Sequence, residues 1–120
     1  MIGIGIDASS SKRLQLITEG DEHFRNSLLG CLDNSSPEAL ILSNYSIIEA
    51  LFKALNCPTL FHPSEISISR EESGHPTISL AGRMQERWRD CNFSVSVTHQ
   101  EDLIIAVVVV YSNLDSKSLN

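Results

Sequence analysis

The chain has 120 residues, of which 42% are hydrophobic and 20% charged, which is typical of an ordinary soluble domain with one buried core. Its formal net charge of −6 argues against general binding to nucleic acid or to an anionic membrane. It has no apolar run of the ~18 residues that a membrane span needs, no export signal and no cysteine pair with metal-binding spacing, so we expect a cytoplasmic protein with free thiols.

The first predicted element is a β-strand over residues 1–6 that ends at Asp7. Isoleucines alternate with glycines along it, so each residue type occupies one face. We expect the isoleucine face to be buried. The glycine face, shared with Asp7, is bare, so another element or a ligand can approach the backbone closely. The isoleucines are Ile2, Ile4 and Ile6, and the glycines are Gly3 and Gly5.

Three helices are predicted next, over residues 11–18, 23–32 and 36–56. The third begins with a serine cap followed by proline in the first turn. Its apolar positions cover a wide arc, so we expect it to be the central buried helix. Its narrower face carries Glu49 and Lys53 one turn apart. The apolar arc includes Leu40, Ile41, Ile47, Ile48, Leu51 and Leu55.

The remaining pattern predicts β-structure interrupted by one short helix. A hairpin is expected from strands at residues 65–69 and 76–80, because they alternate and flank a turn that contains glycine. A helix is expected over residues 82–90, with Met84 and Trp88 on one face. A final hairpin joins residues 94–98 and 103–111.

The last strand is apolar at every position from residue 103 to residue 110, which predicts that both of its faces are covered. In so small a domain, this pattern points to a subunit interface. We expect an α+β fold in which an antiparallel sheet packs on the central helix. A single domain would span residues 1–111, and the polar residues 112–120 would form a frayed tail.

Four segments of the chain match, in order and spacing, the motifs of one enzyme family. Residues 3–7 match a first strand of the form GIGxD, and residues 49–55 match a helix motif KEAxxKAxG. Residues 74–76 match a GxP hairpin, and residues 94–99 match a late strand of the form SxSHT or SxTHT. Over residues 1–111 the chain resembles holo-acyl-carrier-protein synthases, the small bacterial class of 4′-phosphopantetheinyl transferases.

The resemblance implies a 4′-phosphopantetheinyl transferase-like fold and a defined reaction. That reaction transfers 4′-phosphopantetheine from coenzyme A to a serine of apo acyl carrier protein, as in fatty acid biosynthesis. Attack on a pyrophosphate needs a divalent cation, and Mg²⁺ typically takes one or two protein carboxylates. The resemblance therefore implies Mg²⁺ as cofactor, coenzyme A as substrate and acyl carrier protein as partner. It also implies a homotrimer with active sites at the subunit boundaries.

The matched positions imply three catalytic residues, Asp7, Glu49 and Lys53. Asp7 and Glu49 correspond to the family's two metal ligands, and Lys53 corresponds to the lysine that contacts the phosphates. The residues alone also allow simpler interpretations. Glu49 and Lys53 have the spacing of an ordinary helix salt bridge, and Asp7 precedes residues that favour a helix start.

Three further residues receive a role from the resemblance. Thr98 and His99 correspond to positions at the coenzyme A site, and Arg13 corresponds to an arginine that helps to hold the carrier protein. His99 precedes a polar turn, so it is also compatible with a simple turn residue. Arg13 follows Lys12, and the two are compatible with a solvated basic pair.

A second hypothesis is a non-catalytic relative that keeps the fold and acts as a binding or assembly subunit. It is based on departures from the motifs: Ile48 replaces a lysine, Asn44 an arginine and Phe52 a small residue. Residues 56–59 replace a glycine-rich turn, and residues 18–22 are acidic where the family is usually basic. This hypothesis predicts that the chain does not bind coenzyme A.

Overall fold

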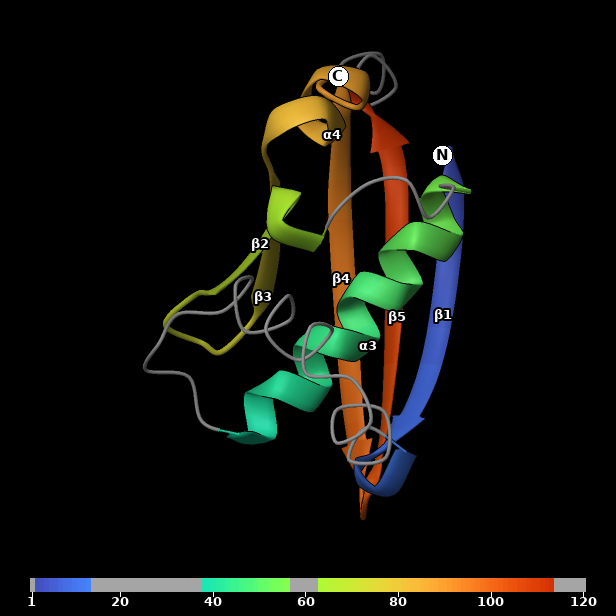
Figure 1. The fold of residues 1–120 in the computed structure, drawn as a ribbon, viewed down its shortest axis with the longest axis vertical. Helices are drawn as coiled ribbons and strands as arrows, with labels where there is room; N and C mark the ends of the chain where they lie inside the picture. The colour runs from blue at the N-terminus through green and yellow to red at the C-terminus, as the bar shows by residue number, and fades with distance from the viewer. Residues whose placement is uncertain (1, 14–37, 57–62, 114–120) are drawn as a thin grey trace.

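A computed structural model describes residues 2–13, 38–56 and 63–113. It shows one long helix packed across a three-stranded sheet, with a separate two-stranded hairpin beside them (Figure 1). The elements are β1 (Gly3–Ser10), α3 (Glu38–Leu55), η1 (Pro63–Glu65), β2 (Ile66–Arg70), β3 (Pro76–Leu80), α4 (Gly82–Arg87), β4 (Cys91–Gln100) and β5 (Leu103–Ser112).

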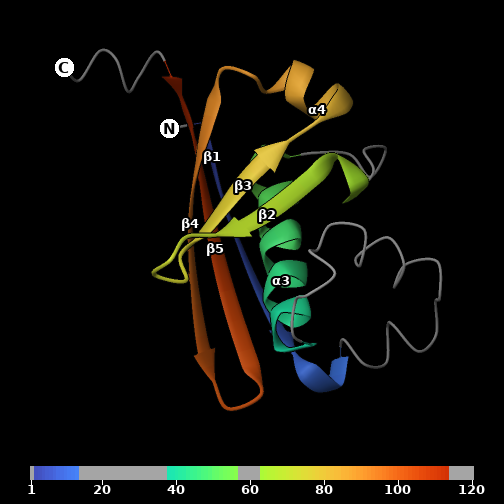
Figure 2. The ribbon, with the colours of Figure 1, turned by 90° about the vertical axis from the view of Figure 1, so that its left-hand side faces the viewer.

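The main sheet has the strand order β1-β5-β4, and both strand pairs are antiparallel. β4 and β5 form the predicted hairpin, whose turn contains Glu101 at φ 57. β2 and β3 form the other predicted hairpin, which lies beside α3, where Arg70 Nη2 donates a hydrogen bond of 2.7 Å to Asn44 Oδ1 (Figure 2). The predicted α+β class, with an antiparallel sheet packed on the central helix, is confirmed.

The core lies between α3 and the inner face of the main sheet. The prediction of a central buried helix is confirmed, since Ile47 and Leu51 are both fully buried. The buried core residues that surround them include Ala50, Ala54, Ile66, Met84, Val95, Ala106, Val108 and Val110. No helix of the described residues is long and apolar enough to span a membrane.

The prediction that the isoleucines of β1 are buried is wrong. Ile2, Ile4 and Ile6 are 55%, 59% and 59% exposed, respectively. The opposite face packs on α3, because its glycines let the helix backbone come into direct contact with the strand. A Cβ atom on Gly3 would overlap the carbonyl oxygen of Ala54, and the same change at Gly5 would overlap that of Ala50. The strand therefore buries its bare face and turns its apolar side chains outward.

β5 is covered on only one face by the described residues of the chain. Alternate residues from Ile104 to Val110 are buried against α3. The intervening residues lie on the same face as the isoleucines of β1, where they are half-buried. We call this the outer apolar face and define it as Ile2, Ile4, Ile6, Ile105, Val107 and Val109.

The remaining predictions differ from the structure mainly at element boundaries. β2 begins at Ile66, because Glu65 belongs to η1 and its Oε1 accepts a hydrogen bond of 2.7 Å from the backbone N–H of Arg83. α4 ends at Arg87 rather than Asp90, and a turn follows it. Residues 11–13 are helical, whereas the rest of the predicted 11–18 helix, the 23–32 helix and residues 114–120 lie outside the described residues.

We expect Gly5→Ala to destabilise the chain by about 1–3 kcal/mol, because the added methyl group meets the backbone of α3. The free energy of unfolding in denaturant measures this change. Ser67→Ala, on the exposed face of β2, is the control and should change that free energy by less than about 0.5 kcal/mol. Equal stability of Gly5→Ala and the native chain would contradict the close packing.

Candidate functional site

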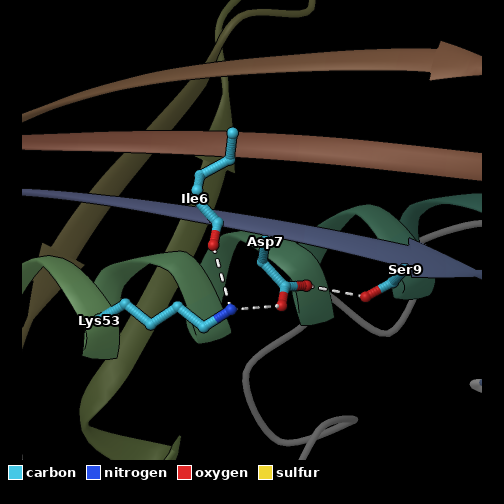
Figure 3. A network of polar contacts seen from close by, with 4 residues as sticks. All are labelled: Ile6, Asp7, Ser9 and Lys53. Atoms are coloured by element: carbon cyan, nitrogen blue, oxygen red, sulfur yellow. Dashed lines mark hydrogen bonds and ion pairs between the residues drawn. The ribbon is translucent and has the colours of Figure 1, made fainter.

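The candidate site lies where α3 crosses the open edge of β1. Asp7 is on the inner face of β1, and Lys53 reaches it from the last turn of α3. Lys53 Nζ donates hydrogen bonds to the Ile6 carbonyl oxygen at 3.0 Å and to Asp7 Oδ1 at 3.1 Å (Figure 3). β1 is an edge strand of the described sheet, so the Ile6 carbonyl is accessible to this side chain.

Ser9 holds the other oxygen of Asp7. Its Oγ donates a hydrogen bond of 2.8 Å to Asp7 Oδ2, and Ser9 is only 4% exposed (Figure 3). The two residues share one face of β1 because they are two positions apart. Sequence reasoning did not identify Ser9, although this spacing was the available signal. Asp7 is thus fixed through both carboxylate oxygens.

Glu49 lies one turn before Lys53 on α3 and is half-buried. Burial raises the pKa of its carboxyl group, and the negative charge of Asp7 raises it further. The positive charges of Lys53 and Arg13 act in the opposite direction. Asp7 and Glu49 are therefore close enough to repel each other when both are ionised, and a cation between them would relieve that repulsion.

Tyr45 lies one further turn back on α3 and is 8% exposed. With Asp7, Glu49 and Lys53 it forms what we call the polar strip. Burial raises the pKa of the Tyr45 hydroxyl group, as do the negative charges of Glu49 and Asp7, while Arg13 lowers it. Sequence reasoning gave Tyr45 no role in the site. Arg13 follows β1, and its backbone N–H donates to Ser10 Oγ at 3.1 Å. The positive charge of its side chain lowers the pKa of both Tyr45 and Glu49.

A shallow hollow of about 260 Å³ adjoins the strip. It is lined by Glu49, Phe52, Lys53 and Asn56 near the end of α3, of which Phe52 also packs against the core. A carboxylate and an ammonium group thus border the hollow on its polar side, while Phe52 contributes an aromatic ring.

Thr98 and His99 lie apart from Asp7 within one chain, because β5 separates β4 from β1. Two strand spacings put about 10 Å between the backbones of β1 and β4. His99 pairs with Ile104 on the inner face, whereas Thr98 pairs with Ile105 on the outer face. Both side chains are exposed.

The acidic residues suit a hard divalent cation that also binds a phosphate ligand. Among the residues that the structure describes, no group of three or more His, Cys, Asp or Glu side chains could form a complete metal site. Mg²⁺ does not need such a group, since one or two carboxylates, waters and substrate phosphates satisfy it. Asp7 Oδ1 already binds one cation, the Lys53 ammonium group. Asp7 and Glu49 therefore fit Mg²⁺.

No protein-family model matches the sequence, and no curated protein matches it. Solved structures match along nearly the whole chain. A holo-acyl-carrier-protein synthase from Neisseria meningitidis is 22% identical, with a TM-score of 0.74 over 93% of this chain and 100% of that one. The enzyme from Plasmodium yoelii is 21% identical, with a TM-score of 0.75 over 94% of this chain and 97% of that one.

The Helicobacter pylori synthase, solved in complex with coenzyme A, is also similar. It is 26% identical, with a TM-score of 0.65 over 90% of this chain and 99% of that one. The chain thus has the fold that the sequence motifs predicted, and the match covers the full length of these enzymes.

We expect Glu49→Gln to stabilise the chain at pH 7 without added divalent cation. The pKa of Glu49 is raised above its ordinary value of 4.5. The stability that the protonated carboxyl group contributes is therefore fully present below pH 4.5 and is lost as the pH rises through the raised pKa. Glutamine stays neutral at every pH, so the variant avoids this loss at pH 7. The gain should stay below about 1 kcal/mol, since the group is half in solvent. Chemical denaturation across pH measures it, with Glu72→Gln in an exposed turn as the control. A loss of stability at pH 7 would contradict the expected repulsion.

Proposed function

We propose that the chain is a 4′-phosphopantetheinyl transferase of the holo-acyl-carrier-protein synthase type. Its substrates would be coenzyme A and a serine of apo acyl carrier protein, in the cytoplasm and in support of fatty acid biosynthesis. The observation that carries this proposal is the contact of Lys53 with Asp7 beside Glu49. The shared fold supports it, because one of the similar structures holds coenzyme A.

In this reaction the serine oxygen attacks the β-phosphorus of coenzyme A. A new phosphorus–oxygen bond forms, the bond to 3′,5′-ADP breaks, and the serine proton passes to water or to a basic group. Bound Mg²⁺ would neutralise the negative charge of the diphosphate. Asp7 and Glu49 would hold it, and Lys53 would contribute a second positive charge next to the phosphates.

The outer apolar face supports a trimer with active sites at its subunit boundaries. It groups isoleucines that are more than half exposed with the half-buried side chains of β5. A contiguous apolar surface of this kind is typical of a protein interface. Thr98 lies on the outer face of β4, and His99, the next residue of the same strand, is exposed on the inner face. We infer that these two residues act at the coenzyme A site of a neighbouring subunit, since they do not reach Asp7 of their own.

Arg13 is the residue that we assign to the carrier protein. It lies just beyond β1, and its charge reaches Glu49, so a carrier bound there would present its serine near the site. The chain as a whole has a net charge of −6. An acidic carrier would therefore bind only where the surface carries local positive charge.

The second candidate function, a non-catalytic subunit, is favoured by two positions on α3. Ile48 is 2% exposed in the core, and Asn44 accepts a hydrogen bond from Arg70. Both side chains therefore serve packing rather than phosphate binding. Calorimetry with coenzyme A and excess Mg²⁺ separates the two functions: micromolar binding favours the transferase, and no binding favours the subunit.

We expect the chain, incubated with coenzyme A, Mg²⁺ and apo acyl carrier protein, to add 4′-phosphopantetheine to the carrier. Asp7→Asn and Glu49→Gln should each slow this transfer by at least ~100-fold, because each removes a ligand of the charge-neutralising cation. Intact-mass spectrometry measures the transfer. Glu72→Gln is the matched control and should transfer at the native rate. No mass gain with any tested carrier would count against the transferase.

We also expect Ile4→Asp to convert a trimer into monomers, since it places a charge in the outer apolar face. Sedimentation equilibrium measures the assembly. Ser67→Asp, on the exposed face of β2, is the control and should leave the trimer intact. A monomeric native chain at the same concentration would contradict the proposed assembly.

A further inference from the structure

We propose that Lys53 is a displaceable counter-ion of Asp7. Its ammonium group binds Asp7 Oδ1 while no divalent cation is present, and it moves toward the phosphates of the ligand when the cation binds. The inference rests on the proposed function, since it concerns the same site. It adds a change of partner for Lys53 that the match of this residue to a phosphate-contacting lysine does not imply.

The two oxygens of Asp7 differ in how firmly they are held. Oδ2 accepts its hydrogen bond from Ser9, which is 4% exposed and lies on the same strand. Oδ1 accepts from Lys53, whose side chain is 54% exposed, against 12% for Asp7. An ion pair that lies half in solvent is weak and exchanges readily. Oδ1 is therefore the oxygen that can change its partner.

A divalent cation and the Lys53 ammonium group compete for this oxygen. Asp7 and Glu49 repel each other across the site, so a cation gains most where it binds both carboxylates. Lys53 binds Asp7 Oδ1, one of the oxygens that such a cation would need. Two positive charges on one oxygen would repel each other. The ammonium group must therefore leave as the cation enters.

The shallow hollow is the place to which the Lys53 ammonium group would move. The Lys53 side chain also lines the shallow hollow with Phe52 and Asn56, on the outer side of α3. Its other partner, the carbonyl oxygen of Ile6, belongs to the edge strand of the described sheet, where water can replace the lysine. Phosphates bound in the hollow would receive the released charge. Release of Lys53 from Asp7 by the cation would then favour binding of the phosphate ligand.

The first test uses the native chain, so it does not depend on the folding of a variant. Reductive methylation of lysine amines is followed by mass spectrometry with and without Mg²⁺. Lys53 should react about two- to fivefold faster with Mg²⁺, the factor that corresponds to a partly exposed ion pair. Lys12, which is exposed beyond the site, is the internal control and should not change. A slower or unchanged rate at Lys53 would overturn the inference.

The second test measures the affinity for Mn²⁺ by paramagnetic resonance of the free ion. Lys53→Met should bind Mn²⁺ about two- to fivefold more tightly than the native chain, because it removes the competing cation. Lys12→Met has the same net charge as Lys53→Met and should bind like the native chain. Asp7→Asn should lose the binding.

The outcomes separate this inference from the proposed function. Native binding that Asp7→Asn abolishes, with no gain in Lys53→Met, would leave the metal site standing and overturn the role of Lys53. Equal gains in Lys53→Met and Lys12→Met would show a general charge effect and overturn it as well. Absence of Mn²⁺ binding in every chain would overturn both the metal site and the inference.

Discussion

The direct packing of a glycine-faced strand on a helix is the constraint on which the rest of this structure depends. A helix approaches a strand this closely only where side chains are missing, and Gly3 and Gly5 provide that surface against Ala50 and Ala54. The contact fixes the position of α3 along β1. As a result, Lys53 meets Asp7 from 46 residues away in the sequence.

The electrostatics of the site follow from that contact. It places Asp7 beside the half-buried Glu49, which raises the pKa of the Glu49 carboxyl group. The positive charges of Lys53 and, to a smaller extent, Arg13 partly offset this repulsion. Carboxylates compensated mainly by a half-exposed ion pair are suited to receive a stronger cation, because little stabilisation is lost when the lysine leaves.

The same contact has a consequence on the other side of the sheet. Since the bare face of β1 is used for the helix, the isoleucines face outward and join the apolar residues of β5. A single chain does not cover this surface with its described residues, and the proposed assembly with further copies is based on it. Thr98 lies at the polar margin of this surface on β4. The packing inside one chain and the proposed assembly of several chains are thus two results of one pattern in β1.

Within the described residues, the sequence by itself determined the types of the main helix and strands and both hairpins, because alternation, helical periodicity and turn residues are local signals. It identified α3 and placed Asp7, Glu49 and Lys53 in one candidate site. It did not determine which face of β1 is buried, since a two-residue period defines two faces without saying which one meets a helix. Nor did it indicate that Ser9 holds Asp7 or that the Ile6 carbonyl binds Lys53. Only the tertiary structure decided those points, because they depend on how closely two elements distant in the sequence approach each other.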